Sequence, residues 1–134
     1  MRARVWPSVA LLLVAAACAP EAPDAEARDQ GRTYTAWLQD REFEKLWERF
    51  SPEMKRTFAS SADLAAFAGE AMADLNGEAG APDETVTRAD TLMVYTRRAA
   101  LANSGNQVVV QWTLTRAGEV TGFVVRPALA LSPG

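Results

Sequence analysis

The stretch QVVVQWTLTRAGEVTGFVVR, residues 107–126, predicts a β-hairpin on which the rest of the chain folds. Apolar side chains occupy alternate positions in its first half and share one face of a strand; they are Val108, Val110, Trp112 and Leu114. Gly118 follows in a short polar stretch and can adopt the positive φ of a hairpin turn. Gly122 in the return strand suggests a bulge or a close backbone approach, and Pro127 ends that strand. The apolar face of such a hairpin needs a cover, which upstream helices can supply.

Helical spacing of apolar residues predicts those helices upstream. It recurs in residues 33–39, 43–50 and 64–75, with Asp40 expected to separate the first two runs. Two start signals stand between the later runs: Ser51-Pro52-Glu53, with a Ser N-cap, a Pro at the first helical position and an acid in the first turn, and Ser60-Ser61-Ala62-Asp63. Gly31 weakens the segment before residue 33, so the start of the first helix is left open.

The segment between the helices and the hairpin predicts further strands. Asn76-Gly77 stops the last helix, and residues 77–83 are expected to form a loop. Residues 85–89 and 92–101 are expected to be strands, although the inner face of the second is ambiguous because both alternating sets contain apolar residues. Helices followed by an antiparallel meander predict an α+β fold with helices on one face of a curved sheet.

Composition bounds the chemistry of the chain. Its 134 residues suit one small domain, and its net charge is −3. Removal of residues 1–17 would take away two arginines and leave 12 basic against 17 acidic residues, or −5. No nucleic-acid partner is expected, because phosphate binding needs a basic surface. The chain has no His and one Cys, which excludes His-based triads, His metal sites and an internal disulfide; no metal or cofactor is expected.

Residues 1–17 are expected to be a signal peptide and not part of the fold. A basic start is followed by an apolar run, residues 9–14, that is too short for a membrane span of about 20 residues. Residues 15–18, Ala-Ala-Ala-Cys, resemble the bacterial lipobox, with Ala15 in place of the usual Leu. This resemblance implies that Cys18 becomes the mature N-terminus and carries a thioether-linked diacylglycerol, often with an amide-linked acyl chain such as palmitate.

The lipobox resemblance also implies a location. Two or more acyl chains anchor a protein firmly, and Ala19 after the Cys resembles the outer-membrane sorting pattern of diderm bacteria. The alternative is an ordinary secretory signal that leaves Cys18 as a free thiol. Residues 18–28 are small and acidic with two prolines, which predicts a flexible tether. The folded domain is then expected over residues 29–127, with residues 128–134 as a disordered tail.

Several motifs resemble a small bacterial domain of unknown function that is often found ahead of serine hydrolases. Residues 43–54, FEKLWERFSPEM, look like its helical signature, and residues 94–97, 110–112 and 122–127 look like its strands. That family is similar to the nuclear-transport-factor-2-like cone, also seen in ketosteroid isomerases and polyketide cyclases. The resemblance covers roughly residues 28–127 and implies a curved antiparallel sheet wrapped over helices, with a cavity at its open end. Its motifs are core patterns, so no catalytic residues carry over.

A few side chains are candidates for a ligand pocket. They are Trp47, Tyr95, Arg97 and Trp112. The aromatic members equally suit a core, in which their polar tips need partners. Consecutive Arg97 and Arg98 point to opposite faces of a strand, so one is expected to face the helices. An inward Arg can bind an anionic ligand bidentately, or it can be a rim residue paired with Glu70 or Asp74.

The expected function is that of a lipid-anchored cell-envelope protein whose domain binds a small ligand or a protein partner without catalysis. A homodimer through the outer face of the sheet is one such partner, with Val109, Thr113 and Val124 near that surface. One alternative is a small cone enzyme with an Asp–Tyr pair that includes Tyr95. The aspartates are expected at caps, helix faces or turns, where burial would not raise their pKa; they are Asp40, Asp63, Asp74, Asp83 and Asp90. A purely structural envelope lipoprotein is the third reading.

Overall fold

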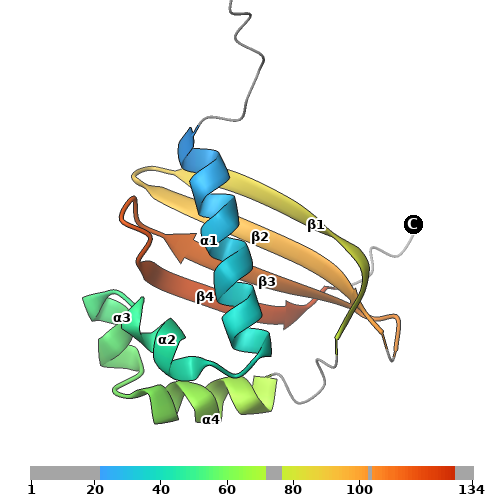
Figure 1. Ribbon diagram of the computed structural model, residues 1–134, viewed down its shortest axis with the longest axis horizontal. Coiled ribbons are helices and arrows are strands. Elements are labelled where there is room, and N and C mark those ends of the chain that lie inside the picture. The colour runs from blue at the N-terminus through green and yellow to red at the C-terminus, as the bar shows by residue number, and fades with distance from the viewer. Residues whose placement is uncertain (1–21, 72–76, 103, 129–134) are drawn as a thin grey trace, which may run out of the picture.

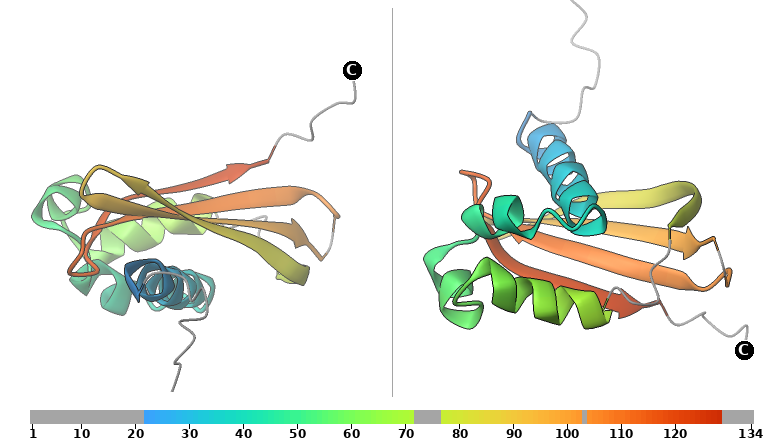
Figure 2. Two further views of the ribbon diagram at one scale, coloured as in Figure 1. Left: turned by 90° about the horizontal axis from the view of Figure 1, so that it is seen from above. Right: turned by 60° about the horizontal axis from the view of Figure 1, so that its bottom comes forward.

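The computed structural model describes residues 22–71, 77–102 and 104–128. In these ranges four helices precede one four-stranded antiparallel sheet with its strands in chain order (Figure 1). The helices are α1 (Ala22–Gln39), α2 (Phe43–Glu48), α3 (Pro52–Thr57) and α4 (Ser61–Ala71), and the strands are β1 (Glu78–Ala89), β2 (Leu92–Leu101), β3 (Gln107–Leu114) and β4 (Val120–Pro127). Figure 2 shows the helices on one side of the twisted sheet. The predicted α+β class is confirmed.

The predicted hairpin, β3 and β4, supplies the centre of the core. Trp112 and Leu114 have no exposed surface, and the side chains of Val108 and Val110 are also buried. The register between the strands is interrupted by one extra residue, Thr121, because Leu114 pairs with Val120 whereas Thr113 pairs with Gly122. The bulge suggested by Gly122 is therefore present in β4.

The register also settles which face of β2 lies inside. Tyr95 pairs with Trp112, and Arg97 pairs with Val110. Directly opposed residues of an antiparallel pair share a face, so Tyr95 and Arg97 face the helices. Arg98 points to the outer face and is exposed. The ambiguity in β2 is removed by β3, whose own alternation was clear in the sequence.

The expected helix start signals are confirmed. The hydroxyl of Ser51 accepts a hydrogen bond from the backbone N–H of Met54, and Pro52 opens α3. Ser60 accepts in the same way from the N–H of Asp63 at the start of α4. After these caps the chain runs beside the sheet, and α2 and α4 pack together near the C-terminal end of α1 (Figures 1 and 2).

Two predicted boundaries are wrong. Residues 22–28 belong to α1 and are not a flexible tether, so the fold begins before residue 29. Ala27 is buried in the core and Asp24 pairs with Arg88 at 3.3 Å, which ties this first part of the helix to the sheet. The loop expected over residues 77–83 is also wrong, because β1 begins at Glu78. The signal peptide, Cys18 and residues 129–134 lie outside the described residues.

The outer face of the sheet carries the three residues that were expected near it. Val124 is 43% exposed there and Thr113 is half-buried. Val109 also lies on this face, opposite Arg98 and Arg126 of the neighbouring strands, but only 1% of its surface is exposed. The expectation that Val109 lies near the outer face is therefore confirmed, although its side chain is itself buried.

Candidate functional site

Polar and charged side chains gather on the inner face of the sheet where α1 crosses β1 and β2. We call this group the Tyr95 cluster; it consists of Arg32 and Gln39 from α1, Glu78 and Glu84 from β1, and Tyr95 and Arg97 from β2. Two of its members, Tyr95 and Arg97, were predicted from the sequence as candidate pocket residues. The other four members lie in α1 and β1, and the residue spacing in the sequence did not indicate that these segments contact Tyr95 and Arg97.

Tyr95 stands at the centre of the cluster and has no exposed surface. Its hydroxyl donates to Oε2 of Glu84 at 2.6 Å. Arg32 donates to both oxygens of the same carboxylate, from Nε and Nη2, at 2.8 Å each. Glu84 is thus held from two sides by a buried phenol and a guanidinium fork.

Arg97 makes a second, similar pair with Glu78. Its Nε and Nη2 donate to the two oxygens of Glu78 at 2.8 and 2.5 Å. Its Nη1 donates to the Tyr95 hydroxyl at 3.3 Å and lies 3.7 Å from Oε2 of Glu84. Arg97 faces Glu78 and Glu84 and not Glu70, which was one alternative; Asp74, the other partner considered, lies outside the described residues. Glu78 was missed because its segment was expected to be a loop.

The contacts in the cluster set its protonation states. Hydrogen bonding from Arg32 and then from Tyr95 outweighs burial and lowers the pKa of Glu84 from 4.5 to about 2. Burial, and then the hydrogen bond to Glu84, raise the pKa of Tyr95 from 10.0 to about 12. The hydrogen bond to Glu78 raises the pKa of Arg97 above its usual range. At neutral pH the cluster therefore holds an ionised carboxylate, a neutral phenol and a charged guanidinium.

This electrostatic arrangement differs from that of an acid–base catalyst. A general base or acid works best when its pKa lies near the operating pH. Glu84 and Tyr95 lie several pH units from neutrality, in opposite directions. The contacts stabilise the resting protonation states and so oppose proton transfer between the two groups.

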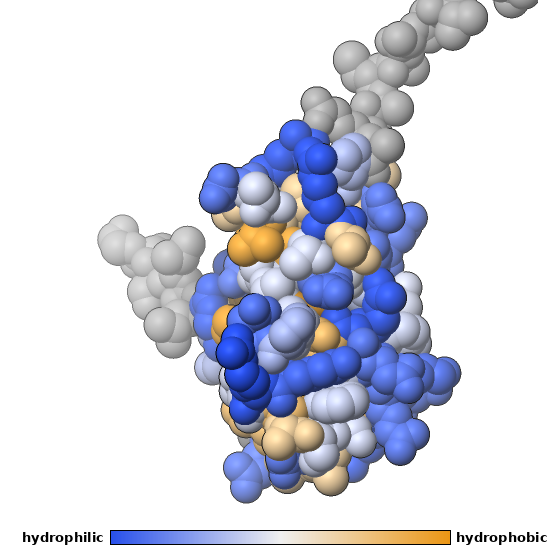
Figure 3. Space-filling view, turned by 90° about the vertical axis from the view of Figure 1, so that its left-hand side faces the viewer, coloured by the Kyte–Doolittle hydropathy of each residue, from blue (hydrophilic) through white to orange (hydrophobic). Residues whose placement is uncertain are grey.

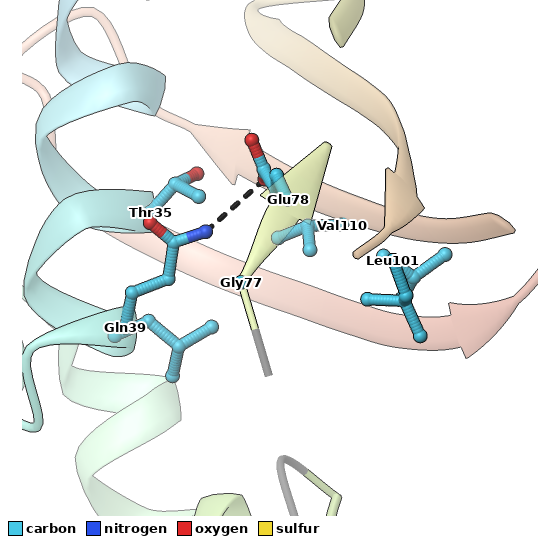
Figure 4. A pocket seen from close by; sticks show the side chains of 8 residues that line it. Thr35, Gln39, Gly77, Glu78, Leu101 and Val110 are labelled. Atoms are coloured by element: carbon cyan, nitrogen blue, oxygen red, sulfur yellow. Dashed lines mark hydrogen bonds between the residues drawn. The ribbon is translucent and has the colours of Figure 1, made fainter. Parts of the chain in front are cut away.

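A small cavity borders the Glu78 side of the cluster (Figure 4). Its volume is about 20 Å³, room for about one water molecule. Its lining combines polar and apolar side chains from α1 and from the sheet; it consists of Thr35, Leu38, Gln39, Gly77, Glu78, Leu101, Val108 and Val110. Gln39 Nε2 donates to Oε1 of Glu78 at 3.1 Å across its mouth. None of the four predicted pocket residues lines this cavity.

The two predicted tryptophans occupy different places. Trp112 is buried beside the cluster, stacks on Phe123 at 5.2 Å between ring centroids and donates from its indole nitrogen to the hydroxyl of Thr35 at 3.0 Å. Trp47 lies on α2, and its indole donates to the carbonyl of Phe58 at 2.8 Å. The structure therefore brings Tyr95, Arg97 and Trp112 together on the inner sheet face and leaves Trp47 apart.

The surface outside the cluster has hollows and exposed apolar side chains of its own. Phe67 on α4 is 51% exposed and packs against Phe58 and Phe123, with centroids 5.3 and 5.9 Å away. The side of the molecule that carries the β1–β2 and β3–β4 turns is mostly hydrophilic, and its apolar side chains form small separate patches (Figure 3). Among the described residues no group of three or more metal-ligating side chains could hold a metal ion. None of the described helices combines the length and apolarity of a membrane span.

Comparisons with models of known protein families, with curated proteins and with solved structures found no match to this chain.

Proposed function

We propose that the protein is a lipid-anchored, extracytoplasmic protein of the cell envelope whose cone-like domain binds a small ligand without catalysing a reaction. The absence of catalysis in this proposal rests on one observation: Arg32 and Tyr95 both donate hydrogen bonds to the carboxylate of Glu84. Arg32 and Tyr95 together keep this carboxylate ionised, and Tyr95 keeps its proton. Of the described side chains, this tyrosine–carboxylate pair comes nearest to the arrangement of a cone-fold enzyme, and its contacts disfavour acid–base work.

The envelope location rests on Cys18 and its Ala-Ala-Ala-Cys context. Ala22, where α1 begins, is four residues further along the chain. Four residues of fully extended chain reach at most about 14 Å. A lipid on Cys18 would accordingly hold the domain close to the membrane. A second copy of the chain on the outer sheet face, which the described helices leave uncovered, would be compatible with this anchoring.

Mass spectrometry of the intact protein tests the anchor. We expect the chain from bacterial membranes to begin at Cys18 and to carry a lipid-sized mass increment. The matched variant, Cys18→Ser, should lose both the increment and its membrane retention. An unmodified wild-type chain in the soluble secreted fraction would refute the anchor.

The second candidate function is a small acid–base enzyme, which the 2.6 Å contact between Tyr95 and a carboxylate favours. The carboxylate belongs to Glu84 and not to one of the aspartates expected for this role. Carbon-13 NMR of labelled glutamate side chains distinguishes the two functions. A Glu84 pKa of about 2 supports binding without catalysis, whereas a Glu84 that titrates near neutral pH would support the enzyme.

A further inference from the structure

The ion pair between Arg97 and Glu78 has the geometry with which proteins hold the carboxylate of a ligand. Two parallel N–H···O bonds join the groups, at 2.8 and 2.5 Å, and such forks match the planar geometry of a carboxylate, as they also match a phosphate. Both side chains are largely shielded, with 17% and 15% of their surface exposed. Gln39 adds a third donor to the same carboxylate.

The backbone that carries Glu78 is suited to local rearrangement. Glu78 is the first residue of β1, an outer strand of the sheet. Gly77 and Gly80 on either side have φ values of +72° and +75°, a region that glycine occupies without strain. The pairing of β1 with β2 shifts register between Ala79 and Asp83. Glu84, by contrast, lies within the regular part of the ladder, so the two carboxylates of the cluster are held in different ways.

The cavity lies directly behind Glu78 (Figure 4). Its sheet side is formed by Leu101, Val108 and Val110, and Leu38 of α1 completes the apolar part. An outward movement of the Glu78 side chain would join this cavity to the Nε and Nη2 edge of Arg97. The enlarged site would then present a guanidinium fork at one end and aliphatic side chains at the other.

We propose that Glu78 is an internal stand-in for a ligand carboxylate, and that the ligand is a small monocarboxylate with a short apolar chain. The ligand's carboxylate would replace that of Glu78 on Arg97, and its chain would enter the space between Leu38 and the sheet. The inference rests on the proposed ligand-binding function and specifies the ligand class. Because the internal carboxylate competes with the ligand, the affinity of the unmodified protein equals the intrinsic affinity of the open site multiplied by the fraction of molecules in which Glu78 is displaced.

Titration with butyrate tests the site in the full chain, held in detergent micelles at constant ionic strength. The nitrogen-15 NMR signal of the Trp112 indole is the readout, since this group bonds to Thr35 in the cavity wall. Minor conformers commonly hold 0.1–10% of a population, so Glu78→Ala should lower the Kd for butyrate at least about tenfold. Arg97→Gln should abolish the saturable shift in either background.

Controls make the outcome specific. Glu119→Ala removes an exposed carboxylate on the β3–β4 turn and should leave the Kd unchanged, and the uncharged analogue butyramide should not bind. Equal Kd values for wild type and Glu78→Ala, binding that survives Arg97→Gln, or no binding by any variant would overturn the proposal.

Two further measurements test the proposal if the Glu78→Ala variant does not fold. Glu78→Gln keeps an oxygen near Arg97 but removes the charge, and it should also bind butyrate more tightly than wild type. Butyrate should speed amide hydrogen exchange of residues 77–81 in the wild-type protein, because the Glu78 side chain that holds this segment is displaced. Unchanged exchange at saturation would contradict the proposal. The mass of the Cys18 form and the titration of Glu84 do not depend on these results, so failure here is distinguishable from failure of the proposed function.

Discussion

Gly31 of α1 lies directly against the ring of Tyr95 in β2. A Cβ built on Gly31 would stand 2.3 Å from both Cγ and Cδ1 of that ring, closer than atoms in contact can approach. The residue that weakens the helix in isolation thus permits the helix to approach the sheet. This approach also places Arg32, the next residue, beside Glu84 and the Tyr95 hydroxyl.

Gly31→Ala should destabilise the protein, although Ala is the better helix former by about 1 kcal/mol. We expect a net loss of about 1–3 kcal/mol because the added methyl group overpacks the contact with Tyr95. Urea unfolding followed by circular dichroism measures it. The control is Gly69→Ala in α4, where an added Cβ meets nothing within 4 Å, and which should gain up to about 1 kcal/mol. Equal stabilisation by both changes would contradict the close packing.

Thr35→Val should cost about 1–3 kcal/mol of unfolding free energy, because it leaves the buried indole N–H of Trp112 without its acceptor. Thr33→Val is a matched control on the same helix. The hydroxyls of Thr33 and Thr35 both donate to the carbonyl four residues earlier, at 3.0 and 2.7 Å, but Thr33 is exposed. Chemical denaturation should show a clear loss for Thr35→Val alone, and similar losses for both would argue against the indole contact.

Glu84→Gln should change the acid stability of the protein in a defined window. The folded-state pKa of Glu84 is lowered from 4.5 to about 2, so its ionised form contributes stability above pH 4.5. This contribution is lost as the pH falls from about 4.5 to about 2. Thermal unfolding across this range should show a shallower decline for Glu84→Gln than for wild type. Glu119→Gln, an exposed control, should follow wild type, and a wild-type slope in Glu84→Gln would refute the assigned contacts.

Tyr95 should remain protonated until the solution is strongly alkaline. Its folded-state pKa is raised from 10.0 to about 12, so the neutral phenol contributes stability that is fully present below pH 10. That contribution is lost as the pH rises from about 10 to about 12. The difference in ultraviolet absorbance between wild type and Tyr95→Phe isolates this residue from Tyr34, the other tyrosine of the chain. Phenolate formation by Tyr95 near pH 10 would contradict the burial and its bond to Glu84.

Tyr34→Phe should loosen the turn between β3 and β4. The Tyr34 hydroxyl donates to the carbonyl of Gly118, and Arg49 donates to the same hydroxyl at 3.1 Å. We expect a loss of about 1 kcal/mol and faster hydrogen exchange at Gly118. Exchange in the β1–β2 turn, residues 89–92, which lies at the same end of the sheet (Figure 1), is an internal control that should not change. Equal changes in the exchange rates of both turns would indicate a global loss of stability and would refute a local effect of the Tyr34 hydroxyl on the β3–β4 turn.

The candidate site was only partly predictable. Tyr95 and Arg97 were singled out because their types and their positions in one strand are visible locally. Glu78 was assigned to a loop, since Gly77, Gly80 and Pro82 suppress the strand pattern around it. A signal for the early start of α1 was available: Ala27, Gly31 and Thr35 recur every fourth residue and all three are buried, but small residues carry little weight in an apolar pattern.

The sequence by itself determined the features that depend on neighbours in the chain. The alternation in residues 107–114 determined the inner face of β3, and Ser51 and Ser60 determined two helix starts, because side-chain direction and capping act over a few residues. Tertiary structure alone decided which distant groups meet. It placed Gly31 on Tyr95, Arg32 on Glu84 and Glu78 on Arg97. These contacts arise from the packing of α1 on the sheet and from the strand register, and no local spacing encodes them.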